Sequence, residues 1–305
     1  MLPFRRDSAA GGLPPAAIAF MLLLAALWGL NMVAVKVTSA GIPPVLQAGL
    51  RSALAAVVVP MLCRPLGLGF GDWRHGGTLA AGIVAGVLFA VEFVALYIGI
   101  GLTTASRAVI FLYGAPFWVA LGTHYLVPGD RLTQAKAIGL CVAFGGLLLA
   151  FADGLRAPAG SDSLLGDLLC LIGGALWAAT TVLVKASALR AVPPALVLQY
   201  QLVVSAPLLL LASLVFGESW AIRASPLVIS SFLYQAVGIA GASYLTWFWL
   251  VSRHSASRLA AFSVLTPVFG VLAGALLLDE ALGGGFLAAV ALVALGLGLV
   301  NRPAR

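Results

Sequence analysis

Charged residues are scarce in this sequence. Only 9% of its 305 residues are Asp, Glu, Lys or Arg, whereas 62% are hydrophobic, and the mean hydropathy is +1.10. A water-soluble domain has about 25% charged residues and is roughly half apolar. So few charges cannot cover a soluble surface of this size, which means that lipid must solvate much of the chain. The composition therefore excludes a soluble domain and predicts a membrane protein.

Cysteine is also rare, and the motifs of several chemistries are missing. The three cysteines are scattered and show no C-x-x-C spacing, which argues against a disulfide framework and a zinc site. No G-x-x-x-x-G-K-[ST] phosphate loop occurs, so direct ATP hydrolysis is not expected. His75, His124 and His254 are isolated from one another in the sequence. We therefore expect no metal, no cofactor and no enzyme activity.

Basic residues outnumber acidic ones, with 17 Lys and Arg against 10 Asp and Glu. In a soluble protein this excess would suggest a nucleic-acid partner. Here most basic residues lie between apolar runs or at their ends, where they set membrane topology. We therefore expect the lipid bilayer as a partner, and no nucleic acid.

Ten apolar segments are long enough to cross a bilayer. A hydrocarbon core about 30 Å thick requires roughly 20 helical residues. With Pro, Gly and charge clusters as breaks, the candidate spans are 16–37, 44–63, 78–99, 105–127, 134–152, 165–185, 194–216, 226–250, 259–278 and 284–301. The first span is longer than the apolar core of a cleavable signal peptide, so we expect it to be retained. The sequence thus predicts an all-α membrane protein with ten transmembrane helices.

Lys and Arg in the loops predict the orientation of these spans. With a cytoplasmic N-terminus, twelve of the 17 basic residues fall on the inner side, and the outer side keeps Lys36, Arg51, Arg107, Arg156 and Arg223. This asymmetry predicts that residues 1–15 are a cytoplasmic segment and that both termini are cytoplasmic. We expect the chain to lie in a bacterial inner membrane.

An internal repeat gives the architecture. Ala-Leu-Trp at 26–28 recurs at 175–177, an offset of 149 residues, and Pro43-Pro44 recurs as Pro193-Pro194 at an offset of 150. Further along, Ala-Ser-Arg at 105–107 recurs at 256–258, an offset of 151. Matches in the same order at nearly one offset indicate a duplicated unit.

Five predicted spans separate each motif from its copy. Because five is odd, the second copy must enter the membrane from the opposite side. We therefore predict two inverted five-helix repeats, residues 16–152 and 165–301. Such repeats are typical of transporters, in which two pseudo-symmetric halves rock around a site at the midplane. Duplication retained for packing alone is the alternative.

Several of these segments resemble a known family. Residues 27–36 (LWGLNMVAVK) resemble the opening of the first EamA repeat of the drug/metabolite transporter superfamily. Residues 256–258, 265–269 (LTPVF) and 278–282 (LDEAL) resemble the end of the second, and residues 116–132 the end of the first. The resemblance covers nearly the whole chain in two copies. It implies a ten-helix exporter and supports amino acids as cargo, since amino-acid exporters of this superfamily are similar to this arrangement.

Glu92 is the one acidic residue placed well inside a predicted span. An ionisable side chain at this depth costs about 2.5–3.5 kcal/mol on insertion scales, so it should face protein or water rather than lipid. It can bind a substrate ammonium or couple transport to protons. The alternatives are a protonated glutamate hydrogen-bonded between helices and a glutamate paired with a basic residue.

Aromatic and small polar residues complete the candidate site. Trp28 and Trp177 are equivalent in the repeat and lie near mid-span, while Tyr113 and Ser263 precede Pro116 and Pro267, where a missing amide loosens the helix. The predicted substrate-binding residues are Trp28, Asn31, Glu92, Tyr113, Trp177, Thr181 and Ser263.

Other aromatic and basic residues can be explained without a role in transport. Tyr97, Tyr200 and Trp247 are readily explained as members of interfacial aromatic belts. Arg107 and Arg258 begin spans on opposite sides, where they can gate the cavity, but snorkelling to the lipid headgroups is the commoner outcome.

The sequence therefore predicts a secondary transporter that exports small metabolites, with neutral or aromatic amino acids as the expected substrates. A nucleotide-sugar or drug transporter of the same superfamily is the alternative within this class. A channel or a membrane-embedded enzyme would belong to a different class. Oligomeric state does not follow from the sequence.

Overall fold

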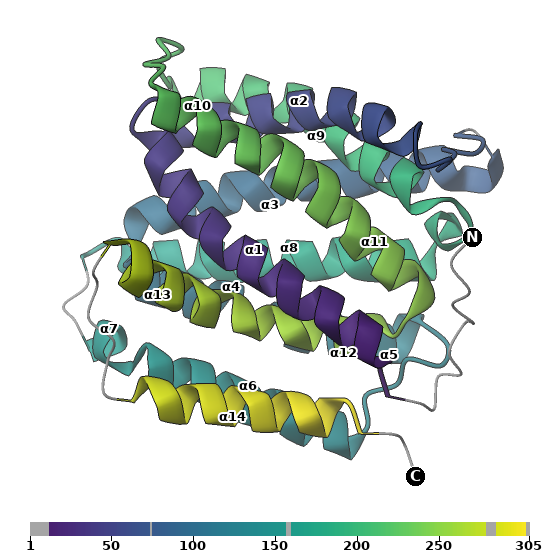
Figure 1. The fold of residues 1–305 in the computed structure, drawn as a ribbon, viewed down its shortest axis with the longest axis vertical. Helices are drawn as coiled ribbons and strands as arrows, with labels where there is room; N and C mark the ends of the chain where they lie inside the picture. Colours follow the sequence, from purple (N-terminus) through teal and green to yellow (C-terminus); the bar gives the residue numbers. More distant parts are fainter. Residues whose placement is uncertain (1–11, 74, 157–159, 279–284, 303–305) are drawn as a thin grey trace.

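A computed structural model of the chain describes residues 12–73, 75–156, 160–278 and 285–302. Every regular element in these ranges is helical (Figure 1). The elements are α1 (Pro15–Ser39), α2 (Pro44–Cys63), η1 (His75–Gly77), α3 (Thr78–Leu102), α4 (Ala105–Leu112), α5 (Ala115–Leu126), α6 (Gln134–Ala150), α7 (Ala152–Arg156), α8 (Ser163–Ala186), η2 (Ala188–Ala191), α9 (Pro194–Val215), α10 (Pro226–Leu233), η3 (Tyr234–Ser243), α11 (Tyr244–Arg253), α12 (Ala256–Ala261), η4 (Phe262–Val264), α13 (Leu265–Leu278) and α14 (Phe286–Val300). Most of the predicted segment 1–15, and Asp279-Glu280 of the LDEAL motif, lie outside the described residues.

Eight helical segments in the described part of the chain are long and apolar enough to cross a membrane. They are Pro15–Ser39, Pro44–Cys63, Thr78–Leu102, Ala105–Leu126, Ser163–Ala186, Pro194–Val215, Pro226–Arg253 and Ala256–Ala273. The predicted spans 134–152 and 284–301 are found as the shorter apolar helices α6, of 17 residues, and α14, of 15 residues. The chain is therefore a multi-pass membrane protein.

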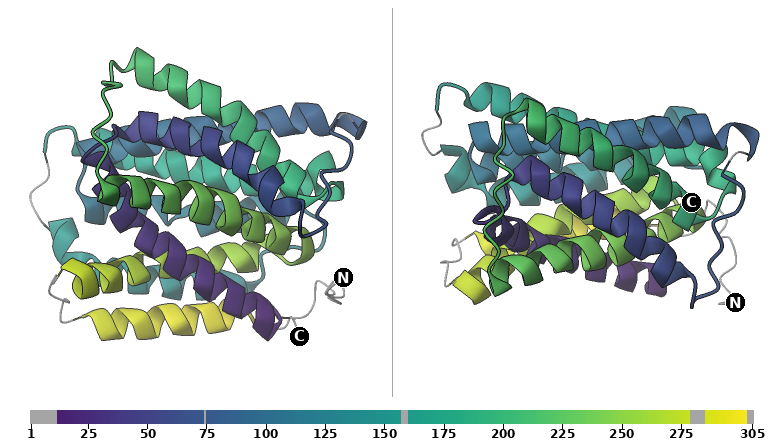
Figure 2. Two further views of the ribbon diagram at one scale, coloured as in Figure 1. Left: turned by 45° about the horizontal axis from the view of Figure 1, so that its top comes forward. Right: turned by 90° about the horizontal axis from the view of Figure 1, so that it is seen from above.

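The two halves of the chain interleave in one bundle. Helix α2 packs against α9, α3 against α8, α1 against α13, and α6 against α14, so each of these contacts joins one half to the other. Figure 1 shows α6 and α14 side by side along one edge. Figure 2 shows α10, η3 and α11 as one continuous rod, which packs against α1 through α10 and η3. The four helix contacts named above therefore hold the two halves together as one bundle.

The close approach of α6 and α14 depends on glycine. A Cβ atom added to Gly139 would lie 2.6 Å from the carbonyl oxygen of Gly296, and one added to Gly296 would lie 2.4 Å from the backbone nitrogen of Ala143. Small residues allow such backbone contact between membrane helices, where dispersion rather than water exclusion drives packing.

Two long spans are broken where the prolines predict it. The span that contains Pro116 divides at Tyr113 and Gly114 into α4 and α5, and the span that contains Pro267 passes through the 3-10 turn η4. Proline has no amide hydrogen to continue the helical ladder, so the backbone loosens in the preceding turn. A third irregularity, the ten-residue π-helix η3, has no such signal in the sequence.

Candidate substrate cavity

A cavity of about 170 Å³ lies between helices of both halves of the chain. It is lined by Trp28, Asn31, Phe89, Glu92, Phe93, Leu96, Leu112, Tyr113, Ala115, Trp177, Thr180, Thr181, Gln201, Tyr244, Trp247, Phe248 and Ser263. All seven residues predicted as substrate-binding are in this wall. The structure therefore brings the predicted set together around one space.

Many lining residues are related by the internal repeat. At offsets of 149 to 151 residues, the lining pairs are Trp28 with Trp177, Asn31 with Thr180, Phe93 with Tyr244, Leu96 with Trp247, and Leu112 with Ser263. The same rule pairs Glu92 with Ser243 and Gln201 with Arg51, and in each of these two pairs one member lines the cavity. Equivalent positions in the two halves thus face the same space.

Trp247 is the central aromatic residue of the wall. Its ring stacks on Trp177, with centroids 5.5 Å apart, and meets Trp28 edge to face at 5.8 Å. Its side chain is 3% exposed, so the interpretation of Trp247 as a belt residue is wrong. Helix α11 continues directly from the π-helix, and the packing of this rod turns Trp247 toward the cavity. The depth of Trp247 along the span does not determine this direction.

The other two residues interpreted as belt residues, Tyr97 and Tyr200, differ from each other in burial. Tyr200 is buried in α9, and its hydroxyl donates to the backbone carbonyl of Trp73 instead of to lipid headgroups. Tyr97 is half-buried and packs against Phe93, behind the cavity wall. Neither residue lines the cavity.

The indole of Trp28 is fixed by the π-helix. Its Nε1 donates to Ser243 Oγ at 3.0 Å, and that hydroxyl in turn donates to the carbonyl of Ile239 at 2.7 Å. The hydroxyl of Tyr234, at the other end of the π-helix, donates to the carbonyl of Leu27 at 2.9 Å. Single π-turns are frequent at functional sites, and here the π-helix sets the position of a cavity tryptophan.

Glu92 lies on α3 with 5% of its surface exposed. Among the residues that the structure describes, its Oε2 atom has no hydrogen-bond partner and Glu92 takes part in no ion pair. Two further acceptors in the wall, Asn31 Oδ1 and Gln201 Oε1, are also buried without a partner in the described part of the chain. Gln201 donates through Nε2 to the carbonyl of Val197 at 3.2 Å, which leaves its oxygen as the free group.

The hydroxyls of three lining residues are satisfied locally. Thr180 and Thr181 donate to the carbonyls of Leu176 and Trp177, and Ser263 donates to that of Ala260. The buried polar atoms of the wall that have no partner among the described residues are three acceptors: one carboxylate oxygen and two amide oxygens. This chemistry suits a ligand with a cationic head that has several N–H donors.

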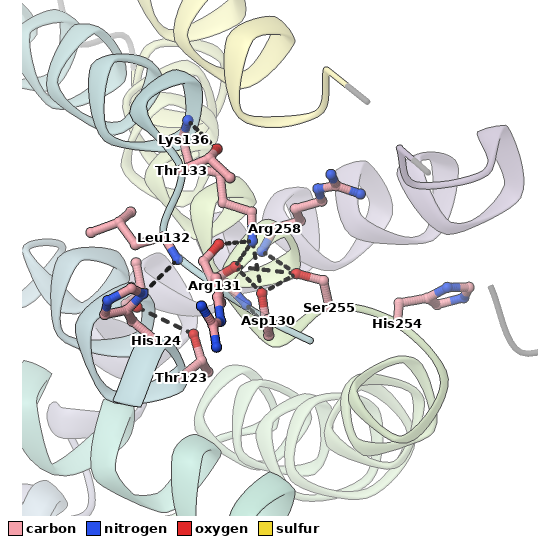
Figure 3. Close-up of polar contacts among 12 residues, drawn as sticks. Thr123, His124, Asp130, Arg131, Leu132, Thr133, Lys136, His254, Ser255 and Arg258 are labelled. Carbon is pink, nitrogen blue, oxygen red and sulfur yellow. Dashed lines mark hydrogen bonds and ion pairs between the residues drawn. The ribbon is translucent and has the colours of Figure 1, made fainter. Parts of the chain in front are cut away.

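A second polar cluster joins the two halves at one end of the bundle (Figure 3). The carboxylate of Asp130, in the loop after α5, accepts from Lys136 Nζ at 2.8 Å and from Ser255 Oγ at 2.7 Å. It also accepts from the hydroxyl and the amide of Ser257, at 2.5 and 3.1 Å. Burial raises the pKa of Asp130, but the charge of Lys136 and these hydrogen bonds outweigh it and hold the pKa below its ordinary value.

An ion pair lies at the other end of the span Ala105–Leu126, the span that Asp130 follows. Arg107, in the first turn of α4, pairs with buried Asp167 of α8, and Thr103 Oγ1 donates to the same carboxylate at 2.7 Å. At the other end of the bundle Arg258 is 5% exposed and donates to the carbonyl of Arg302 at 3.3 Å. Each guanidinium therefore has at least one protein partner, and gating and snorkelling both stay predictions.

Sequence reasoning missed several lining residues, of which Gln201 had a detectable signal. It is a polar residue in an apolar span and is the repeat counterpart of Arg51. Arg51 itself was assigned to the outer side, but α2 buries it to 1% exposure. Among the residues that the structure places, no three His, Cys, Asp or Glu side chains form a group that could hold a metal ion.

Comparison with known proteins gives the family. Residues 15–152 and 164–302 each match the EamA-like transporter family. The chain is 30% identical over 281 residues to an Escherichia coli protein named "Probable amino-acid metabolite efflux pump", with 88% of this chain and 89% of that protein covered. It is 28% identical to the "Uncharacterized transporter YvbV" of Bacillus subtilis, with 95% and 93% covered.

A solved structure gives the fold. One crystal structure superposes with a TM-score of 0.79 at 20% identity and covers 97% of this chain and 98% of the other. The two family matches together span most of the chain, and the relatives that the chain resembles are named as an efflux pump and a transporter. The chain therefore belongs to the EamA-like transporter family of the drug/metabolite transporter superfamily, and it is a multi-pass membrane transporter of small molecules.

Proposed function

We propose that this transporter exports neutral amino acids, above all aromatic or large aliphatic ones such as phenylalanine and methionine. The substrate would occupy the cavity between the halves, bound by Trp28, Asn31, Glu92, Tyr113, Trp177, Thr181 and Ser263. The observation that carries this proposal is a small cavity with aromatic walls, into which unpaired acceptor groups are built.

The size and walls of the cavity favour a small apolar body. Its volume of about 170 Å³ is below the range of about 300–1,000 Å³ typical of sites for drug-sized ligands. Stacking against Trp177 or Trp247 would add about 0.5–1.5 kcal/mol for an aromatic side chain beyond the burial of its area. This argues for an amino acid over a nucleotide sugar, which also needs basic residues, and none of the described lining residues is Lys or Arg.

The acceptors favour an ammonium group as the polar head. Glu92 Oε2, Asn31 Oδ1 and Gln201 Oε1 are buried and unpaired, and a buried polar group without a partner is destabilising until a ligand satisfies it. A free α-ammonium has three N–H donors and a positive charge. Protonation of Glu92 would compete with this cation, so exchange of a proton for the substrate is the coupling that we propose.

The mechanism that we propose is alternating access by two inverted repeats, residues 16–152 and 165–301. It would need ten spans, and the two short apolar helices α6 and α14 would be the fifth and tenth. The pairing of repeat-equivalent residues across one cavity supports this symmetry. Both termini would then be cytoplasmic, in a bacterial inner membrane. Asp130 with Ser257 and Arg107 with Asp167 would close the two ends in turn.

The names of relatives point in the same direction. The proteins similar to this chain in Escherichia coli and Salmonella typhimurium are each named "Probable amino-acid metabolite efflux pump" and are 30% identical to it. The direction of transport that we propose, export rather than uptake, follows those names. A channel remains the rival from another class, and it would show flux that does not saturate with substrate.

Counterflow of labelled phenylalanine in proteoliposomes tests the proposal. Wild-type protein should accumulate label against unlabelled phenylalanine, and flux should saturate with substrate. Trp177→Ala should lower this counterflow, because it removes one stacking face, whereas Trp118→Ala should not, because Trp118 is exposed on α5 and outside the cavity. An absence of counterflow with every neutral amino acid would overturn the substrate while leaving the family intact.

A further inference from the structure

Arg51 is a buried cation whose guanidinium is only partly satisfied by the described residues. It lies on α2 with 1% of its surface exposed, and it donates a hydrogen bond to the hydroxyl of Tyr244, which lines the cavity. Its Nε and Nη2 atoms have no hydrogen-bond acceptor among the described residues. The guanidinium carbon lies 4.3 Å from the ring centroid of Phe93, so a cation–π contact compensates part of its lost hydration. A guanidinium has five N–H donors in a planar fork that matches a carboxylate. The guanidinium thus keeps Nε and Nη2 for an anion that the described residues do not supply.

The internal repeat places Arg51 at the cavity. Pro43-Pro44 and Pro193-Pro194 set an offset of 150 between α2 and α9, which makes Gln201 the counterpart of Arg51. Gln201 lines the cavity from the second half. Arg51 holds the equivalent position in the first half, one layer back, against the ring of Phe93, which lines the cavity.

Arg51 and Glu92 do not neutralise each other by direct contact. They lie within electrostatic range, but they are not among the ion pairs of the described residues, and Glu92 Oε2 also lacks a partner. If Arg51 served only to compensate Glu92, a direct pair would be the stable arrangement, since separated buried charges are costly. Two opposite charges that form no ion pair with each other, one in the cavity wall and one behind it, instead match a ligand that carries both signs apart.

We infer that Arg51 binds the carboxylate of a zwitterionic substrate whose ammonium is bound at Glu92. The inference rests on the proposed function and identifies the residue that binds the carboxylate of the amino acid. The Phe93 ring must turn aside so that the carboxylate reaches the guanidinium. An amine would leave Arg51 unpaired and a carboxylic acid would leave Glu92 unpaired, so the site rejects both.

Ligand competition in the full-length wild-type transporter tests this directly. Counterflow of labelled phenylalanine in proteoliposomes is measured with unlabelled phenylalanine, with phenylethylamine, which lacks the carboxylate, and with 3-phenylpropionate, which lacks the ammonium. Phenylalanine should compete at least about tenfold better than either analogue, because each analogue leaves one buried charge unpaired.

The variant Arg51→Gln places the residue of the repeat counterpart at this position. It should bring phenylalanine and phenylethylamine to within about threefold of each other, because the carboxylate no longer has a receptor. Arg64→Gln, an exposed arginine just after the same helix, is the matched control and should keep the wild-type preference. Arg51→Lys keeps the charge without the planar fork and should retain part of the preference.

The outcomes separate the two claims. Equal competition by phenylalanine and phenylethylamine in the wild type would overturn the role of Arg51 while phenylalanine transport still supported the proposed function. A preference that survives Arg51→Gln would do the same. No counterflow of phenylalanine at all would overturn both. If Arg51→Gln does not fold, the wild-type competition and Arg51→Lys still decide the question.

Discussion

At the scale of single residues, part of the cavity wall is predictable from composition and from the internal repeat. The rest is determined by how the helices pack. Trp28 and Trp177 were predicted from their equivalence in the repeat, and Glu92 from its depth in a span. Trp247 and Arg51 were misplaced, because an apolar span of one sequence does not show which face meets protein. The direction of a side chain depends on neighbouring helices, and here those neighbours come from the other half of the chain.

Glu92→Gln tests the role of the intramembrane carboxylate. Glutamine has nearly the same shape and no charge, so the substrate ammonium loses a charge-assisted contact worth roughly 1.5–3 kcal/mol. We expect phenylalanine binding to weaken about tenfold or more, and counterflow to lose its dependence on pH between about pH 5 and pH 8. Counterflow at a series of pH values measures both, with membrane yield as the control for insertion. Normal transport across that range would rule out the role of Glu92.

Trp28→Phe tests the contact between the cavity and the π-helix. Phenylalanine keeps an aromatic ring but removes the N–H that donates to Ser243 at 3.0 Å. The free energy of unfolding should fall by about 0.5–1.5 kcal/mol, the usual net value of one hydrogen bond. Trp118→Phe, at an exposed position on α5, should change it less. Denaturation in detergent measures the difference, and equal losses in the two variants would contradict the assigned contact.

At the scale of helices, the breaks were predictable only where a proline marks them. Pro116 and Pro267 each follow an interruption that loosens the span. The π-helix η3 carries no equivalent signal, because wider turns are set by packing and not by residue type. Helices α6 and α14 begin and end within two residues of the predicted spans 134–152 and 284–301. After Ala150 the backbone turns into the separate helix α7.

Asp130→Asn tests the polar cluster that joins the loop after α5 to α12. The variant leaves Lys136 buried without its counter-ion, and removing one member of a buried pair typically costs about 3–5 kcal/mol. We expect a lower unfolding temperature in detergent. Asp153→Asn breaks an exposed pair with Arg156 and should leave the unfolding temperature unchanged. Similar effects of the two variants would show that the cluster does not join the halves.

The contribution of Asp130 should depend on pH only in acid. Its pKa is lowered in the folded protein, so its stabilisation is present above the ordinary value of about 3.9. It is lost as the pH falls through the lowered folded value. The difference in stability between wild type and Asp130→Asn should therefore be constant at neutral pH and shrink in strong acid.

At the scale of the whole molecule, the two halves line one cavity together. Helices α3 and α8, α2 and α9, and α6 and α14 pair across the halves, and equivalent residues such as Leu112 and Ser263 line the same cavity. The repeat offset predicted that matched residues would be related, although not that the halves would interleave so closely. This arrangement supports the alternating access that we propose, in which a shift of one half against the other would change both ends of the cavity at once.

Accessibility of the cavity from both faces of the membrane tests that account most directly. A cysteine is placed at Leu112, a half-buried lining residue, after Cys63, Cys141 and Cys170 are replaced, with exposed Ser219 in the loop after α9 as the control position. Leu112→Cys should react with a membrane-impermeant thiol reagent added to either face, and phenylalanine should slow both reactions, whereas phenylalanine should have no effect on the reaction of Ser219→Cys. Reaction from one face only, or reaction that phenylalanine leaves unchanged, would contradict a shared amino-acid cavity with alternating access.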